Sequence, residues 1–301
     1  MITLLETVFP VFLIFLSGYI VQKKFNLDIK SISTMSIYIL SPALIFDTFY
    51  TTKLNHEFIY IIVIQVLLLL ALIVTTKIAC RLFRYDIRTE SALMLTTAFM
   101  NSGNYGTPII LFAFGDKGFD KAVLIMVLQS ILMGIFAVYF ASRGKASVKT
   151  AVLNIFRLPN IYAVIIGLLL QYCHIPLSTN FMQAVELLGG ASIPVVMLVL
   201  GMQLAMVTIK DLDGKLVAFG TVIRLIISPV LAWGICSLFP ISPLSKQVMF
   251  VIAGMPPAAM ALLYAIRFEA KAKLVSSITL ISTVLSFLSI MVLLSIVKWV
   301  T

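Results

Sequence analysis

The nine residues Met100–Pro108, "MNSGNYGTP", place two asparagines, two glycines and a proline inside an apolar segment that runs from about Ala92 to Phe114. In a helix interior glycine costs about 1 kcal/mol and proline about 3 kcal/mol relative to alanine, so the helix is predicted to break here. Irregular backbone at membrane depth is tolerated only where it is buried in protein or lines a wet cavity. Thr107 and Pro108 resemble a cap residue and a first-turn proline, which predicts that a new half-helix begins there.

The rest of the chain supplies the membrane context. Its 301 residues are 61% hydrophobic and only 11% charged, with a mean hydropathy of +1.11. Soluble domains carry roughly a quarter charged residues, so this composition predicts an integral membrane protein. The net charge of +10 comes from basic residues in short loops. Membrane topology explains that pattern, and no nucleic-acid partner is expected. The three cysteines lack CxxC spacing, and we expect them to pack rather than bind metal.

Runs of about 20 apolar residues predict ten membrane-spanning helices. They cover residues 4–22, 32–51, 57–80, 91–114, 119–141, 159–174, 181–207, 215–239, 247–267 and 273–299. The loops after the odd-numbered spans hold 16 lysines and arginines, and the opposite side holds 5. Because basic loops stay in the cytoplasm, both termini are expected to lie outside the cytoplasmic membrane.

The two halves of the chain carry similar proline positions. Pro42 and Pro108 fall in spans 2 and 4, and Pro194 and Pro256 fall in spans 7 and 9. Five helices per half would place the second copy upside down relative to the first, as in transporters built from inverted repeats. The expected organisation is a first repeat at 1–142, a cytosolic linker at 143–158 and a second repeat at 159–301. Proline in membrane helices also serves kinks and close packing, which is the alternative reading of the pattern.

An inverted pair of broken helices has an electrostatic consequence. Pro256 and Pro257 are expected to start a half-helix in span 9, as Pro108 does in span 4. Both N-terminal ends, each carrying roughly half a positive charge, would face one point near the midplane and favour an anion. Asn101 and Asn104 add uncharged donors and acceptors beside Gly103 and Gly106. The alternative is that the asparagines only satisfy the broken backbone.

Four stretches resemble the auxin efflux carrier family, which includes plant PIN proteins and bacterial malonate and malate permeases. They are "NSGNYGTP", "ASIPVVMLVLGMQLA", "IRLIISPVLAW" and "MPPAAMALLYAIRFEA". The resemblance implies a fold like that of bile acid:sodium symporters, with ten helices in two inverted repeats and with helices 4 and 9 broken and crossing. It implies a scaffold of helices 1, 2, 6 and 7 and a mobile transport domain of helices 3–5 and 8–10.

The resemblance also assigns roles to residues. The asparagine, glycine and proline that lie near the bound carboxylate in PIN proteins match Asn101, Gly106 and Pro108. Many bacterial relatives have asparagine after the span 9 "PxAA" motif, where this chain has Met260. That departure removes a polar group from the expected crossing, so it bears on which substrate or coupling ion is used.

Three further polar residues within spans are candidates for function. Arg224 lies about ten residues into span 8, where it would hold the anion, bind backbone carbonyls or extend partly toward the cytosolic end of the span. Asp47 in span 2 is a candidate for proton coupling, or else an interfacial carboxylate in contact with water. Gln129 in span 5 is placed to reach the cavity. Spans 4 and 9 contain no acid, which favours protons or uniport over sodium.

These features predict a secondary active transporter or uniporter for a small organic anion, such as malonate, malate or an auxin-like acid, working by alternating access. No enzyme motif, ATP-binding motif or cofactor is expected. The expected location is the cytoplasmic membrane of a bacterium, and the expected partners are the anion and the bilayer, with a homodimer left open. An ion-coupled carrier of another solute, a channel or a sensor are the alternatives. Import and export are not distinguished.

Overall fold

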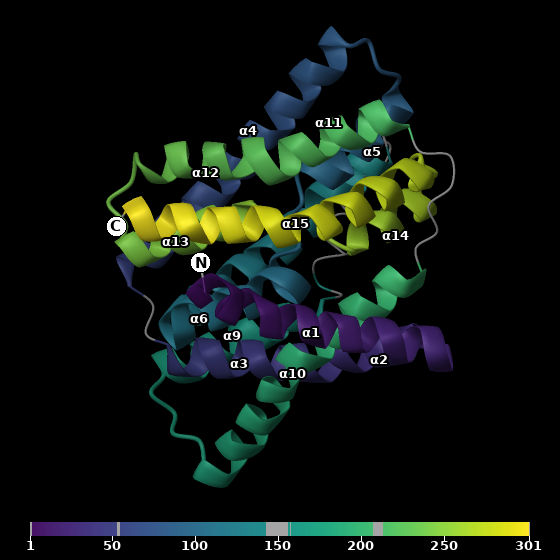
Figure 1. Ribbon diagram of the computed structural model, residues 1–301. Helices are drawn as coiled ribbons and strands as arrows, with labels where there is room; N and C mark the ends of the chain where they lie inside the picture. The colour runs from purple at the N-terminus through teal and green to yellow at the C-terminus, as the bar shows by residue number, and fades with distance from the viewer. Residues whose placement is uncertain (1, 53–54, 143–155, 157, 207–212, 301) are drawn as a thin grey trace.

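The computed structural model describes residues 2–52, 55–142, 156, 158–206 and 213–300 (Figure 1). The predicted linker, 143–158, lies almost entirely outside these ranges. Within the described residues the chain is helical, with no strand beyond one isolated bridge. Seven of these helical stretches are long and apolar enough to cross a bilayer, namely Val8–Phe25, Ile29–Thr51, His56–Leu82, Ser102–Ala141, Thr179–Met206, Gly214–Cys236 and Ala272–Val297. The prediction of an all-helical, multi-pass membrane protein is confirmed.

The helices follow one another as α-helices interrupted by short π-helical turns, labelled η. Their order is α1 (Ile2–Phe25), α2 (Ile29–Met35), η1 (Ser36–Leu40), α3 (Ser41–Thr51), α4 (His56–Leu82), α5 (Ile87–Thr97), η2 (Ser102–Gly106), α6 (Thr107–Leu132), η3 (Met133–Ala137), α7 (Val138–Ala141), α9 (Pro159–Tyr172), α10 (Thr179–Met206), α11 (Gly214–Val222), η4 (Ile223–Ile227), α12 (Ser228–Cys236), α13 (Pro243–Ala253), α14 (Met260–Arg267) and α15 (Ala272–Val300).

The difference between ten predicted spans and seven long helices has three causes. The predicted ninth span is divided into α13 and α14, both too short to cross alone. The predicted sixth span is the 14-residue helix α9. The predicted fourth span is cut into α5 and the beginning of the next stretch, which then runs on without a loop into the fifth. In that stretch Gly115 has φ 65° and ψ −165°, a conformation favoured by glycine, and it turns the chain between two helical runs.

Several Pro residues inside spans follow a π-helical turn. Ser41-Pro42 follows η1, Thr107-Pro108 follows η2 and Ser228-Pro229 follows η4. Proline lacks an N–H and its ring crowds the preceding turn, so a wider turn before it relieves the clash without ending the helix. At these three positions proline stands in the first turn of an α-helix that directly continues a π-helical turn.

The helices form two groups. In Figure 1, α1, α2, α3, α9 and α10 lie in the lower part of the view and most other helices lie above them, while α6 is drawn next to α1 and α9. The α1–α10 group comprises α1–α3 with η1, α9 and α10, in which α1 packs along α10 and α3 packs against α9 and α10. The crossing group comprises α4–α7 and α11–α15 with η2–η4. Within the first group glycines allow close approach: a β-carbon at Gly201 would overlap the backbone carbonyl of Phe15, and one at Gly18 would overlap that of Leu198.

Hydrogen bonds and ion pairs hold each group of helices together, but almost none of them joins one group to the other. Among described residues, the hydrogen bonds and ion pairs between helices lie within one group or the other. The exception is Thr52, whose hydroxyl lies within hydrogen-bonding reach of Asp120, at the point where the chain itself passes from α3 to α4. Elsewhere the contact is apolar: Phe12 and Phe15 of α1 pack on Tyr105 of η2 and Phe287 of α15.

Candidate functional site

The interrupted helices α5–η2 and α13–α14 meet at their interruptions. Met100 and Pro257 form an isolated antiparallel bridge. The N–H of Asn101 donates to the carbonyl of Pro256 at 2.8 Å, and the N–H of Ala258 donates to the carbonyl of Phe99 at 2.9 Å. The two bonds are related by a local two-fold axis through the bridge. Four helix ends therefore gather at one point: the C-termini of α5 and α13 and the N-termini of η2 and α14.

The interruption near the glycine motif is displaced from the predicted position. Helix α5 ends at Thr97, residues 98–101 form a non-helical segment that includes the bridge residue Met100, and helical structure resumes at Ser102. The α-helix α6 begins at Thr107 with Pro108 in its first turn, as predicted, but η2 precedes it without a gap, so helical structure after the interruption starts at Ser102 and not at Thr107. The Thr107 hydroxyl donates back to the carbonyl of Gly103 at 2.6 Å, a mid-helix bond rather than a cap.

The second interruption shows a related displacement. Pro256 and Pro257 lie in the extended segment itself, and α14 begins at Met260. Neither proline starts the half-helix as predicted. Because proline has no N–H, this segment forms its bonds through the Pro256 carbonyl and the Ala258 amide. Met260, the first residue of α14, is 44% exposed, so its side chain does not fill the crossing.

Asn101 is the best-placed polar side chain of the motif. It is 6% exposed and precedes η2, and its backbone carbonyl accepts from the N–H of Gly106 at 3.0 Å. Its side chain does not cap the helix, and neither Asn101 nor Asn104 forms a side-chain hydrogen bond to another described residue. The first amides of a helix lack intrahelical partners, so the N–H groups after Asn101 are available to an acceptor. Gly103 lies close to the Met126 side chain, where a β-carbon would be 3.2 Å away.

Arg224 lies at the crossing and is fully buried. Its Nη1 donates to the carbonyl of Thr97 at 2.7 Å, and its Nη2 donates to the carbonyl of Ala253 and to the Ser228 hydroxyl. Thr97 and Ala253 are the last residues of α5 and α13. Of the roles left open by the sequence, the structure shows hydrogen bonding to the backbone: Arg224 binds a carbonyl at the end of each of the two half-helices.

The other two candidates lie away from the crossing. Gln129 is buried between α6 and α4, where its Oε1 accepts from Gln65 Nε2 at 2.6 Å. Asp47 is partly buried in α3, in the α1–α10 group, with Asp120 and Glu186 as its nearest charges. Sequence reasoning missed Ser228, although its spacing of four residues from Arg224 places both on one helix face. It also missed Tyr105, whose hydroxyl lies 2.6 Å from that of Ser286.

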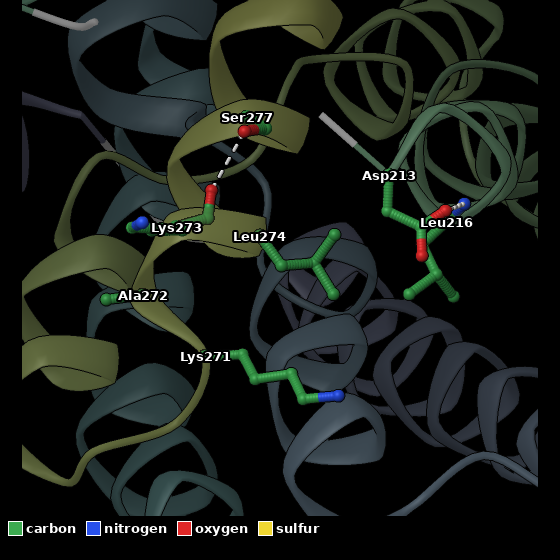
Figure 2. A pocket seen from close by; sticks show the side chains of 7 residues that line it. All are labelled: Asp213, Leu216, Lys271, Ala272, Lys273, Leu274 and Ser277. Atoms are coloured by element: carbon green, nitrogen blue, oxygen red, sulfur yellow. Dashed lines mark hydrogen bonds between the residues drawn. The ribbon is translucent and has the colours of Figure 1, made fainter. Parts of the chain in front are cut away.

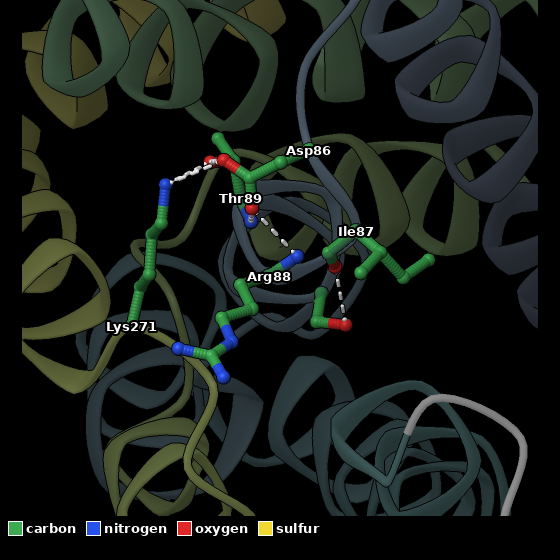
Figure 3. A network of polar contacts seen from close by, with 6 residues as sticks. Asp86, Ile87, Arg88, Thr89 and Lys271 are labelled. Atoms are coloured by element: carbon green, nitrogen blue, oxygen red, sulfur yellow. Dashed lines mark hydrogen bonds and ion pairs between the residues drawn. The ribbon is translucent and has the colours of Figure 1, made fainter.

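Two polar contacts fix the far ends of the interrupted helices. Figure 3 shows Asp86, the N-cap of α5, accepting from Lys271 Nζ at 2.7 Å and from the hydroxyl of Thr89 at 2.7 Å. The Lys271 ammonium and the Thr89 hydroxyl hold the pKa of the Asp86 carboxyl well below its usual range. At the start of α13, the N–H of Ser242 donates to Glu57, which also pairs with Lys121 at 2.9 Å.

An open cavity of about 410 Å³ lies between α11 and α15, lined by Asp213, Leu216, Lys271, Ala272, Lys273, Leu274 and Ser277 (Figure 2). It does not include any residue of the crossing. We place the candidate site at the crossing because four helix ends and the buried Asn101 side chain meet there, whereas no residue of the crossing lines the cavity.

Comparisons with known proteins identify the family of this chain. The chain is 26% identical over 302 residues to an uncharacterized transporter of Methanocaldococcus jannaschii, covering 95% of this chain and 96% of that protein. It is 28% identical over 298 residues to an uncharacterized transporter of Methanothermobacter thermautotrophicus, covering 95% of each. A family model described as "Membrane transport protein" matches residues 3–294. The chain therefore belongs to this family of membrane transport proteins, the family of the auxin efflux carriers that its motifs resemble.

Proposed function

We propose that this protein is a secondary active transporter or uniporter that moves a small organic anion across the cytoplasmic membrane by alternating access. The observation that carries the proposal is the antiparallel contact between residues 99–101 and 256–258, where two interrupted helices meet. Transporters with discontinuous helices bind their substrate at such a point.

The electrostatics of the crossing favour an anion. The N-termini of η2 and α14 each contribute roughly half a positive charge. The guanidinium of Arg224 is bound by carbonyls at the other two helix ends, so it offsets their negative ends and leaves the positive N-terminal ends uncompensated. No acidic residue occurs in segments 91–113 and 247–267. A carboxylate would accept from the free amides after Asn101 and from its side-chain amide, without displacing a fixed negative charge.

Paired contacts support the inverted repeat of two five-helix halves. The bonds from Asn101 to Pro256 and from Ala258 to Phe99 exchange under a local two-fold axis. The buried pair Gln65–Gln129 joins α4 to α6, and Thr221–Ser282 joins α11 to α15, the corresponding helices of the second half. In this scheme α5–η2 is helix 4, α13–α14 is helix 9, and the boundaries lie near 142 and 159.

The two groups of helices support a moving-domain mechanism. The α1–α10 group corresponds to the scaffold and the crossing group to the transport domain. The contact between them is aromatic and apolar, so a displacement exchanges few directional bonds. The coupling ion, if one is used, is a proton or, less favourably, sodium. Asp47 is the candidate proton-coupling group because it is partly buried and the carboxylates of Glu186 and Asp120 are close enough to act on its charge. Both termini are placed outside the cytoplasm.

Counterflow in liposomes tests this function. The purified protein is first screened by thermal shift against mono- and dicarboxylates, because a ligand that binds only the folded state raises its stability. Vesicles are then preloaded with the unlabelled hit, and uptake of the labelled compound is followed. A carrier shows accelerated exchange, whereas a channel shows none.

Asn101→Ala supplies the matched variant. Removing this amide should abolish the ligand-induced thermal shift and the exchange while leaving insertion and basal melting temperature close to wild type, since Asn101 has no side-chain partner among the described residues. Gln129→Ala is the control, because this residue lies away from the crossing, and it should keep ligand binding. Wild-type exchange by Asn101→Ala would remove Asn101 from the site. Failure of every carboxylate to bind and exchange would remove the proposed substrate class.

A further inference from the structure

The C-terminal ends of the two interrupted helices share a single cation. The guanidinium of Arg224 reaches the carbonyls of Thr97 and Ala253, and the Ser228 hydroxyl also donates to Ala253 at 2.7 Å. Arg224 has no exposed surface, and no acidic side chain of the described chain pairs with it. Its counter-charge is therefore supplied by main-chain dipoles.

The charges balance without an acid. Each helix C-terminus carries roughly half a negative charge, so the two ends together offset about one positive charge. Arginine stays protonated in proteins, so this compensation does not depend on pH. Arg224 lies within η4, a π-helical turn, and such turns occur often at functional sites.

The atoms that hold the guanidinium form a typical set of ligands for a small cation. Two carbonyl oxygens and one hydroxyl converge from α5, α13 and α12. Hard cations bind such neutral oxygens, and ends of broken helices coordinate the coupling ion in sodium-driven carriers. In this protein the same kind of position is occupied by a side chain of the protein itself.

We infer that Arg224 is a tethered cation that takes the place of a coupling cation between the two half-helix ends, so that the anion site is assembled without sodium or potassium. This inference rests on the proposed function, whose crossing it completes. Arg224 acts as a positioning residue: it holds the C-termini of α5 and α13 together and leaves the N-termini of η2 and α14 for the anion.

Chemical rescue tests this role. Melting temperatures of purified wild type, Arg224→Ala and Arg267→Ala are measured in choline chloride at constant ionic strength, with sodium, potassium, guanidinium or urea added at about 20 mM. Arg224→Ala should melt several degrees lower than wild type and regain at least half of that loss with guanidinium, and part of it with sodium or potassium. Urea, which has the same shape but no charge, should restore nothing.

Wild type and Arg267→Ala should respond to none of these additions. Arg267 is an exposed arginine in the last turn of α14, so its removal controls for the loss of one positive charge. Ser228→Ala keeps the guanidinium and both carbonyls and should likewise remain indifferent to sodium. An arginine that only filled space would give a lower melting temperature in Arg224→Ala without charge-selective rescue, and that result would overturn the inference.

Two further measurements keep the inference testable if Arg224→Ala does not fold. Arg224→Gln keeps hydrogen-bond donors but no charge, and it should show the same rescue by cations. The wild-type arm needs no variant: a melting temperature or carboxylate affinity that rises with sodium would also overturn the inference. None of the melting measurements without ligand requires a carboxylate, so their outcome is separate from the outcome of the counterflow test.

Discussion

Phe15 in α1 stacks on Tyr105 in η2, with ring centroids 5.2 Å apart and ring planes inclined by 22°. Tyr105 follows Asn101 by four residues, so this stack connects the crossing directly to the α1–α10 group. The hydroxyl oxygen of the same tyrosine lies 2.6 Å from the hydroxyl oxygen of Ser286 in α15. One side chain thus forms a polar bond within its own group and an apolar contact with the other.

These two contacts can be separated by mutation. Tyr105→Phe removes the hydroxyl but keeps the ring, and we expect a loss of about 1–2 kcal/mol in unfolding free energy, because the Ser286 hydroxyl loses a buried partner. Phe15→Ala should cost more, about 3 kcal/mol, since a largely buried ring is deleted. Denaturant unfolding in detergent measures both. Equal losses would contradict the assignment of the contacts.

Close helix packing within the α1–α10 group predicts a sharp contrast between two glycines of α10. In Gly201→Ala the new methyl group would overlap the backbone carbonyl of Phe15, so α1 must move away, at a cost of about 1–3 kcal/mol. Gly190 has open space around it, and Gly190→Ala should be neutral or stabilising by up to about 1 kcal/mol. Melting temperatures of the two variants compare them directly, and a neutral Gly201→Ala would contradict the close contact.

The ion pair between Glu57 and Lys121 is largely buried, and Glu57 also accepts from the Ser242 amide. Glu57→Gln should destabilise the protein by about 2–4 kcal/mol, because it leaves the lysine charge without its partner. Glu57→Gln combined with Lys121→Met should recover part of that loss. A double-mutant cycle on unfolding free energies measures the coupling, and additive losses would show that the pair does not interact.

The Asp86 carboxyl has a pKa that is lowered by Lys271 and Thr89, which gives its stabilising effect a defined pH dependence. A lowered folded-state pKa contributes stability above the unfolded pKa, about 3.9, and that contribution is lost as pH falls through the folded value. The melting-temperature difference between wild type and Asp86→Asn should therefore be constant from about pH 8 to pH 5 and shrink below about pH 4. A difference that changes between pH 8 and pH 6 would point to another group.

The sequence predicted that the segments around Met100 and Pro257 would be interrupted, but not where. Glycines and Pro108 favour a break within their own positions, yet the residues that leave the helix, Ala98–Met100, carry no local signal for it. The conformation of this segment is set by hydrogen bonds to residues 155 positions or more away in the chain, which local propensity does not register. The π-helical turn before Pro108 was likewise not visible, because a wide turn and a helix start satisfy proline equally well.

The candidate site was likewise predictable only in part. Arg224 was recognised from its position in an apolar span, since a charge there is costly. Its partners were not, because they are main-chain carbonyls of Thr97 and Ala253, and any residue type carries a carbonyl. Gln129 was expected at the cavity on polarity alone, whereas Gln65 on the facing helix pairs with it instead. The sequence showed that a polar residue lies within a span, but only the fold shows which group it hydrogen-bonds to.

Two sets of hydrogen bonds hold the crossing together, and they restrict the ways in which a bound solute could leave. Backbone bonds join residues 99–101 to 256–258, and one guanidinium joins the ends of α5 and α13. Separating these segments would break all of those hydrogen bonds together and leave the Arg224 guanidinium without its partners. If the protein works as proposed, we expect release to come from movement of the intact crossing group relative to the α1–α10 group, and not from separation of the two interrupted helices.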